Sequence, residues 1–478
     1  MSDPLVNMAA EQALVGAMMI QNGLIGELSD RVKPDDFGDK LHGRIYSAML
    51  RFHARGMAST SITLRPVFIN DGDARYGEYL DELVSVPAVV DAAESIADQV
   101  ADLSRRRHVR EAMQAASRAL VEDLDRPVGE IAAQVERAAW SVDSARDTTP
   151  LDAAEMIGLV QKRRQRILDD PGAVGLTNHL IEDVDKGLGP IERGTYNIVA
   201  GRPGMGKSAF VSSLALGYAI NGHCGLYLQH EMSNEQQSMR MLADLSHAMG
   251  LAIPHSNIRK NRLSDDELHA MDRVRDKAKI LPLRYVAPGM IDVRKVYALV
   301  AQHKAMWEAQ GRELEFVVID YIGLLGATDE EGRPIEDDRK RVNAVSKMLK
   351  RIAEELNVAV FALAQLGRGV EQRSSPRPYL SDLKESGNLE QDADTVTLLF
   401  REEYYLQARE PKRGATEKGI NLHEEWEAEY QASRDKMDAI FAKNRHGSSS
   451  TRMLRCMLQH YAVRSGSFDQ MYDEPLLV

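Results

Sequence analysis

Apolar residues in the first third of the chain recur at the three- and four-residue spacing of a helix, and β-branched clusters are scarce there. This spacing places apolar side chains along one face of a helix, where they can pack against a neighbouring element. The pattern predicts helices over residues 11–20, 42–52, 76–86 and 89–122. We therefore expect residues 1–122 to form an all-helical domain.

Residues 123–180 are predicted to form a linker. A helix is expected over residues 128–145, and the polar run of residues 146–150 ends in Pro, as linkers often do. A second amphipathic helix is expected over residues 153–168. Its basic residues crowd one side: Lys162, Arg163, Arg164 and Arg166. Such a face is usually solvated, but an isolated amphipathic helix also commonly docks onto a neighbour, so both interpretations stay open.

Short apolar segments alternate with helical ones from residue 194 onward. Strands are predicted over residues 195–200, 224–229, 316–319, 358–364, 395–400, 439–442 and 453–458. Helices between the early strands indicate an α/β domain with a largely parallel sheet, which we place at residues 181–478. The last strands have no helix between them, which favours antiparallel strands at one edge of that sheet.

A phosphate-binding loop stands between a strand and a helix of this domain. Residues 201–208 match G-x-x-x-x-G-K-[ST] in full, with a strand over residues 196–200 before them and a helix over residues 209–220 after them. Glycine lets backbone amides turn inward around a phosphate, and the helix N-terminus favours negative charge. The predicted cofactors are ATP and Mg²⁺, with Lys207 on the β- and γ-phosphates and the Ser208 hydroxyl on the metal. The candidate nucleotide-binding residues are Gly201, Pro203, Gly204, Met205, Gly206, Lys207, Ser208 and Ala209.

Two carboxylates complete the predicted hydrolytic site. Asp320 ends the buried strand of residues 316–319, where a carboxylate faces the phosphate loop, so we expect it to hold Mg²⁺ through water. Tyr321 follows it where many related ATPases have Glu, so the general base must come from elsewhere. Glu231 stands at the tip of the strand after the phosphate-loop helix and is our candidate general base. His230 beside it is expected to pack or to form hydrogen bonds.

Charge and cysteine content narrow the class of protein. The formal net charge is −12, which argues against a passive, histone-like DNA binder but leaves room for a local basic channel. Cys224 and Cys456 both stand in apolar segments and are expected to be buried thiols. Residues 1–10 lack the basic and apolar regions of a signal peptide, and no stretch has the roughly 18 apolar residues of a membrane span. We expect a cytoplasmic protein.

Several motifs together resemble the DnaB replicative helicases, a family of RecA-like hexameric helicases. The matching segments are residues 197–210 (NIVAGRPGMGKSAF), 231–233, 320–325, 361–366, 377–394 and 442–447. The helical third is similar as well, at Glu11-Gln-Ala-Leu-Val-Gly and Pro34-Asp-Asp-Phe. The resemblance covers nearly the whole chain and implies a RecA-like ATPase domain behind a helical collar.

The resemblance also implies further roles at the ATP site. Gln365 is expected to link nucleotide state to the DNA loops. Arg445 is expected to cross a subunit interface to the γ-phosphate of a neighbour, with Lys443 beside it on the same strand face. Without the resemblance, both would be surface cations on an edge strand. Arg240 is expected to contact the γ-phosphate or to orient Glu231.

Two loops are expected to contact DNA. One covers residues 367–377 and contains Arg368, Arg373 and Arg377; the other covers residues 384–387. Lys384 and backbone amides near Glu385 and Gly387 would hold phosphates, which suits a motor that moves along any sequence. The alternative is a flexible polar loop without a partner.

The resemblance implies a replicative DNA helicase that moves 5′→3′ on single-stranded DNA at the replication fork. Its expected partners are further copies of itself in a homohexamer, a primase docked on residues 1–122, and a helicase loader. The charged segment of residues 402–436 departs from the family and is expected to be a surface insertion. An alternative remains: a RecA-like switch or recombinase-type protein that does not unwind. Residues 381–394 and the helical domain favour the helicase.

Overall fold

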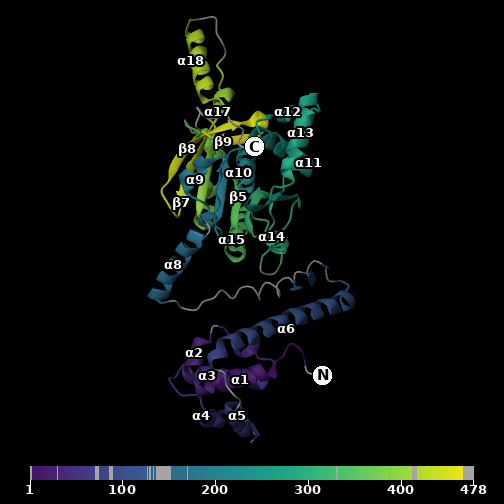
Figure 1. Cartoon of the computed structure of the whole chain (residues 1–478), viewed down its shortest axis with the longest axis vertical. Coiled ribbons are helices and arrows are strands. Elements are labelled where there is room, and N and C mark those ends of the chain that lie inside the picture. Colours follow the sequence, from purple (N-terminus) through teal and green to yellow (C-terminus); the bar gives the residue numbers. More distant parts are fainter. Residues whose placement is uncertain are drawn as a thin grey trace. The chain divides into compact units, whose positions relative to one another are not determined.

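A computed structural model of the chain (Figure 1) describes two compact units, residues 1–160 and residues 161–478. The division falls inside helix α8 (Ala153–Asp169), and each unit has its own apolar core. The described residues are 3–466, with the exception of 30, 70–74, 86–89, 126–127, 129–130, 133, 136–151, 170, 330–331, 374, 387 and 412–416.

The first unit is helical throughout its described residues, as predicted. Its helices are α1 (Met8–Ile20), α2 (Gly23–Glu27), α3 (Lys40–His53), α4 (Ser61–Ile69), α5 (Arg75–Ser85) and α6 (Ala93–Glu122), with 3-10 turns η1 (Pro34–Asp36) and η2 (Val90–Ala92). Two of these helices, α2 and α4, were not predicted. The first is too short to show a period, and Pro66 interrupts the second. The predicted helix at residues 128–145 and the polar run after it lie largely outside the described residues.

A buried carboxylate joins three elements of this unit. Glu11 on α1 is 1% exposed and accepts hydrogen bonds from the amides of Gly38 (2.7 Å) and Asp39 (3.1 Å). His42 Nδ1 of α3 lies 2.9 Å from the same carboxylate, and its Nε2 lies 2.6 Å from the hydroxyl of Tyr79 on α5. A carboxylate only accepts, so Nδ1 carries the proton. Burial opposes ionisation of Glu11, but these hydrogen bonds hold its pKa below the usual value.

The second unit is built on a nine-stranded sheet in the order β3-β2-β4-β5-β1-β6-β7-β8-β9. Its strands are β1 (Tyr196–Gly201), β2 (Cys224–Gln229), β3 (Leu283–Val286), β4 (Leu314–Asp320), β5 (Ala359–Gln365), β6 (Thr395–Phe400), β7 (Lys436–Asn444), β8 (Ser450–Met457) and β9 (Ala462–Ser465). All pairs from β3 to β6 are parallel, and those from β6 to β9 are antiparallel. The predicted mixed sheet is confirmed, while β3 and β9 were not predicted.

Helices cover both faces of the sheet. They are α9 (Glu182–Leu188), α10 (Lys207–Ile220), α11 (Asn234–Ala248), α13 (Asp265–Ala278), α14 (Val293–Glu308) and α15 (Asp338–Leu356), and the short helix α12 (His255–Arg259) packs beside α11. Alternate residues of a strand enter opposite cores: Ile198 of β1 lies in the core that contains side chains of α14 and α15, and Val199 lies in the core that contains side chains of α10. Burial on both faces explains why the parallel strands are continuous apolar runs.

Strand register brings distant segments to one edge of the sheet. Gly201 at the end of β1 lies beside Gln365 at the end of β5, and Gln229 at the end of β2 lies beside Asp320 at the end of β4. Parallel strands end on the same side, so the segments that follow them converge there.

The segment at residues 402–436 contains two helices, α17 (Glu402–Ala408) and α18 (Glu417–Ser433), between β6 and β7. Figure 1 shows α18 pointing away from the sheet. The Trp426 ring stacks on Tyr430 at 5.3 Å, and its Nε1 donates to the carbonyl of Leu406 at 2.9 Å, which joins the two helices. None of the helices in the described part of the chain has the length and apolar character needed to cross a membrane.

Removing the Glu11 carboxylate tests whether it holds the helical unit together. Glu11→Ala leaves the Gly38 and Asp39 amides and His42 without their acceptor, so we expect a loss of about 3–5 kcal/mol in the free energy of unfolding. Chemical denaturation of the full chain measures it. Glu27→Ala, on the exposed end of α2, is the control and should change stability by less than about 0.5 kcal/mol. Equal effects of both substitutions would contradict the role given to Glu11.

Candidate functional site

The edge where β1, β2, β4 and β5 end carries a cavity of about 610 Å³, within the roughly 300–1,000 Å³ usual for small-molecule sites. It is lined by Pro203, Gly204, Gly206, Lys207, Ser208, Ala209, Glu231, Met232, Gln236, Arg240, Asp320, Tyr321, Gln365, Leu458 and Tyr461. Most of the residues expected at the ATP site therefore share one cavity. Gly201 does not line it, and the Met205 side chain is 1% exposed in the apolar core.

The phosphate loop has the backbone that its glycines predict. Gly204 and Gly206 both have φ of 82°, a region in which other residues are strained. Lys207 Nζ donates to the carbonyls of Gly201 (2.9 Å) and Arg202 (3.2 Å). Burial lowers the pKa of Lys207 to about 8, against the opposing charges of Asp320 and Glu231. An anion at this loop would restore the favoured charged form of the lysine.

Asp320 lies at the end of β4 and is 7% exposed. Burial raises its pKa, while hydrogen bonds from the hydroxyls of Ser208 and Tyr227 lower it; Tyr227 donates at 3.1 Å. A buried carboxylate beside a serine hydroxyl offers the oxygen ligands that Mg²⁺ prefers. The described residues contain no cluster of three or more His, Cys, Asp or Glu that could hold a metal alone. Phosphate and water oxygens would have to supply the other ligands.

Glu231 follows β2 in a bend and is exposed on the cavity wall. The next helix, α11, begins with a capping box between Ser233 and Gln236, which fixes its first turn. Gln236 and Arg240 are four residues apart on one face of α11, and both line the cavity. The Arg240 guanidinium lies 4.5 Å from the ring centre of Tyr461.

His230 is placed as a hydrogen-bonding residue, as expected. Its Nδ1 lies 2.6 Å from the carbonyl of Gly289, and its backbone amide donates to the carbonyl of Asp320 at 2.8 Å. Burial lowers the pKa of His230, which favours the neutral ring. The amide contact joins the C-terminal ends of β2 and β4, and the ring contact joins the end of β2 to the segment that follows β3.

Several residues at the site were not predicted. Met232, Gln236, Leu458 and Tyr461 line the cavity, and the last two come from the segment that joins β8 to β9. Met232 lies in the matching segment 231–233 but was given no role there, and no motif includes the other three, which the fold brings to the phosphate loop. Arg202 was treated only as a loop position. It is 8% exposed, pairs with Glu371 at 2.9 Å and donates to the carbonyl of Leu366 at 2.8 Å.

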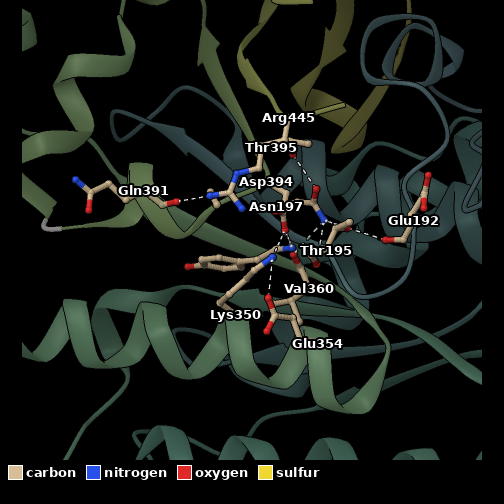
Figure 2. Close-up of polar contacts among 12 residues, drawn as sticks. Glu192, Thr195, Asn197, Lys350, Glu354, Val360, Gln391, Asp394, Thr395 and Arg445 are labelled. Carbon is tan, nitrogen blue, oxygen red and sulfur yellow. Dashed lines mark hydrogen bonds and ion pairs between the residues drawn. The ribbon is translucent and has the colours of Figure 1, made fainter. Parts of the chain in front are cut away.

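Arg445 and Lys443 lie outside the cavity. Arg445 pairs with Asp394 at 2.9 Å (Figure 2). The Asp394 carboxylate also accepts from the amide of Tyr196, the first residue of β1. The phosphate loop follows the other end of this strand, about 16 Å away at 3.3 Å per residue. Lys443 lies in β7, which ends at Asn444, and Arg445 follows in a turn; the side chains of both cations contact residues 389–394.

The two segments expected to contact DNA form short 3-10 turns, η5 (Arg368–Gln372) and η6 (Leu380–Ser386). Arg368 is exposed on η5. Arg373 pairs with Asp382 of η6 at 2.5 Å, so this arginine joins the two segments. Lys384 and Glu385 lie within η6, and Gly387 lies outside the described residues.

Comparisons with known proteins agree with this architecture. The sequence-family model of the DnaB-like helicase N terminal domain matches residues 3–102, and the family model of the DnaB-like helicase C terminal domain matches residues 175–463. The replicative DNA helicase DnaB of Rickettsia felis is 30% identical over 464 residues, which cover 92% of this chain and 89% of that protein. The replicative DNA helicase DnaC of Bacillus subtilis is 28% identical over 422 residues, covering 86% and 88%.

Solved structures show the same fold. A DnaB-like replicative helicase, described with its interactions with primase, has a TM-score of 0.61 and 23% identity over 96% of this chain and 100% of that one. A second solved structure, of an isolated ATPase domain, has a TM-score of 0.54 and 25% identity over 66% of this chain and all of its own. The sheet of the second unit is thus RecA-like. Because one family model alone spans more than half of the sequence, the chain belongs to the DnaB-like helicase family of ATP-dependent DNA helicases.

Proposed function

We propose that this replicative helicase works as a homohexameric ring that moves 5′→3′ along single-stranded DNA and unwinds duplex at the replication fork, in the cytoplasm. One observation supports the assembly of several copies into a ring. The phosphate loop, Glu231 and Asp320 share a cavity, whereas Arg445 is anchored at the opposite end of β1, about 16 Å away. Arg445 is therefore too far from its own nucleotide and is available to that of an adjoining copy.

The roles within the cavity follow from its chemistry. Backbone amides of the phosphate loop bind the phosphates, and Lys207 neutralises charge on the β- and γ-phosphates. Ser208 and Asp320 would hold Mg²⁺, which when bound offsets charge on the phosphates. The Ser208 hydroxyl and the buried Asp320 carboxylate support this assignment.

Glu231 is the proposed general base. Its exposed carboxylate on the cavity wall takes a proton from water, the water oxygen attacks the γ-phosphorus, and the bond to the bridging oxygen of ADP breaks. Arg240 lines the same cavity and is positioned to contact the γ-phosphate or to orient Glu231. Arg445 and Lys443 of the adjoining subunit offset the charge that develops on the transferred group.

The DNA contacts are proposed for the η5 and η6 segments. Arg368, Arg373 and Lys384 supply positive charge, and backbone amides near Glu385 and Gly387 supply neutral donors. Gln365 ends β5 on the cavity wall, three residues before η5 begins at Arg368. The Arg202–Glu371 pair forms a second connection from the phosphate loop to η5. Nucleotide state can thus change the position of a DNA-contacting segment.

The remaining partners are a primase and a helicase loader. A related solved structure is described with its interactions with primase, and the helical unit of residues 3–102 is the proposed counterpart here. We place the domain boundaries at residues 1–122, 123–180 and 181–478. Exposed apolar residues of α8 support its docking onto an adjacent subunit: Met156, Ile157, Leu159, Val160 and Leu168. The match to both helicase domains disfavours a RecA-like switch without unwinding.

The pKa of Lys207 predicts how nucleotide affinity depends on pH. A bound polyphosphate stabilises the ammonium, so binding requires a proton once the pH exceeds the value of about 8 for the protein alone. We expect the Kd of a non-hydrolysable ATP analogue to be constant below that pH and to rise above it. Titration calorimetry between about pH 7 and 9.5 measures this. Lys207→Arg, whose guanidinium stays charged, should bind more weakly without the inflection; a flat wild-type profile would contradict the assignment.

Complementation between two inactive variants tests the shared site. Arg445→Ala and Glu231→Gln should each lower kcat for ATP hydrolysis by about 10³-fold. In a ring assembled from equal amounts of both, about one quarter of the interfaces join an intact Glu231 pocket to an intact Arg445, so hydrolysis should return. Mixing Arg445→Ala with a chain that carries Arg445→Ala and Glu231→Gln together is the control, and should recover nothing because no intact arginine is present. No recovery in the first mixture would sink the in-trans role.

Forked DNA tests the unwinding direction. A ring on the 5′ tail that moves 5′→3′ excludes the other strand, so a fork with both tails should be unwound with ATP. A substrate with only a 3′ tail should remain duplex, and Lys207→Ala should unwind neither. Release of the labelled strand on a native gel measures both. ATP hydrolysis without unwinding of any fork would support the switch-like alternative.

A further inference from the structure

The two oxygens of the Asp394 carboxylate accept hydrogen bonds from different groups. Oδ2 accepts from the amide of Tyr196 at 2.8 Å and from Nζ of Lys350 on α15 at 2.6 Å. Oδ1 accepts from a terminal nitrogen of the Arg445 guanidinium, at 2.9 Å. Figure 2 shows Asp394 between Arg445 on one side and Lys350 on the other. One oxygen thus anchors the start of β1, while the other holds the proposed arginine finger.

Arg445 is held at several points. Its second terminal nitrogen donates to the carbonyl of Gln391 at 2.7 Å, and its backbone amide donates to the carbonyl of Asp394 at 3.0 Å. The arginine side chain is 45% exposed, whereas that of Asp394 is 7% exposed. A buried, fixed acceptor therefore grips one edge of the guanidinium. A guanidinium has five N–H donors, so its exposed part can still donate to a neighbour's phosphate.

Asp394 is ionised while it accepts the hydrogen bond from Arg445. Burial alone would raise its pKa, but hydrogen bonds from Lys350 and the Tyr196 amide, with the charges of Lys350 and Arg445, hold the pKa below its usual value. A charged carboxylate forms the stronger, better oriented contact with a guanidinium.

The second cation is held by the same short segment. Lys443 Nζ donates to the carbonyls of Glu390 (2.6 Å) and Ala393 (2.8 Å). These carbonyls belong to helix α16 (Leu389–Asp392) and to the residue after it. The last carbonyls of a helix have no partner within it, and they favour cations. Residues 389–394 thus provide acceptors for the side chains of both Arg445 and Lys443.

This segment follows η6 in the sequence; η6 ends at Ser386, and α16 begins at Leu389. It is fastened to α15 by two hydrogen bonds: the Asn388 amide donates to Asn343 Oδ1 at 2.7 Å, and Ser346 Oγ donates to Asp392 at 2.6 Å. Only seven residues separate the end of η6 from Asp394, so η6 and the groups that hold both cations are close along the chain.

We propose that Asp394 is a positioning residue: it orients Arg445 toward the nucleotide of the adjoining subunit and makes that orientation depend on the DNA-contacting segment at η6. The inference rests on the proposed in-trans role of Arg445. It adds a third connection between DNA and hydrolysis, which acts on the neighbour's site and is separate from the connections through Gln365 and through the Arg202–Glu371 pair.

Asp394→Asn is the direct test. Its single side-chain oxygen can go on accepting from Tyr196 and Lys350, which turns its NH2 group toward Arg445, where a donor meets a donor. We expect kcat for ATP hydrolysis by the assembled protein to fall about 10- to 100-fold, with KM changed by less than about threefold. Stimulation by single-stranded DNA should be lost, so that rates with and without DNA converge. Native mass measurement should show wild-type assembly.

Two further variants separate positioning from packing. Lys350→Gln removes the other cation from Asp394 but can still donate to it, and should keep kcat and DNA stimulation. Equal losses in both variants would overturn the proposal. If Asp394→Asn does not assemble, Asp394→Glu keeps the charge that pairs with Lys350 while displacing the oxygen that holds Arg445. It should show the same loss of kcat and of stimulation.

A double-mutant cycle distinguishes the positioning role of Asp394 from the proposed in-trans role of Arg445, on which it rests. On an Arg445→Lys background, which cannot make the two-point contact, Asp394→Asn should lower kcat by less than about twofold further. Full additivity would overturn the proposal. Wild-type kcat and stimulation in Asp394→Asn, with Arg445→Ala inactive, would exclude positioning by Asp394 and leave the in-trans arginine intact. Normal hydrolysis by Arg445→Ala would instead remove the shared site and the inference with it.

Discussion

The length of strand β1 is the constraint on which the catalytic design depends. One end leads into the phosphate loop, and the other is pinned by Asp394, which also holds Arg445. An extended strand is stiff, so the anchor of the arginine and the phosphate loop of one chain stay about 16 Å apart. Neither side-chain motion nor local repacking closes that distance. With the proposed role of Arg445, a complete hydrolytic site therefore requires two copies of the chain.

Both ends of the same strand are connected to segments that we assign to DNA. At the phosphate-loop end, Arg202 pairs with Glu371 of η5. At the other end, Asp394 and α16 continue into η6. The pair between Arg373 and Asp382 joins the two segments to each other. A strand of nucleic acid that displaces them would therefore affect two sites, the nucleotide of its own subunit and that of the neighbour.

The sequence was sufficient to predict elements whose burial or backbone geometry leaves a regular pattern of residues. Strands β1 and β5 are buried on both faces and appear as apolar runs, and the phosphate loop has fixed glycine positions. Strand β9 was missed because Arg464 interrupts its apolar pattern. That arginine is fully buried and pairs with Asp244 of α11 at 2.7 Å, a partner 220 residues away. Strand β3 was missed because it is a half-exposed edge of four residues.

The contacts that hold Arg445 could not be predicted from sequence motifs. The resemblance included Asp394, but only as the end of a DNA-contacting run, since nothing in a linear motif pairs it with a residue 51 positions later. The second acceptor for the Arg445 side chain is the backbone carbonyl of Gln391, which every residue type at that position would provide. What matters there is that α16 ends at Asp392 and leaves its carbonyls free for cations. A helix end is a property of backbone geometry, so this contact becomes visible only in three dimensions.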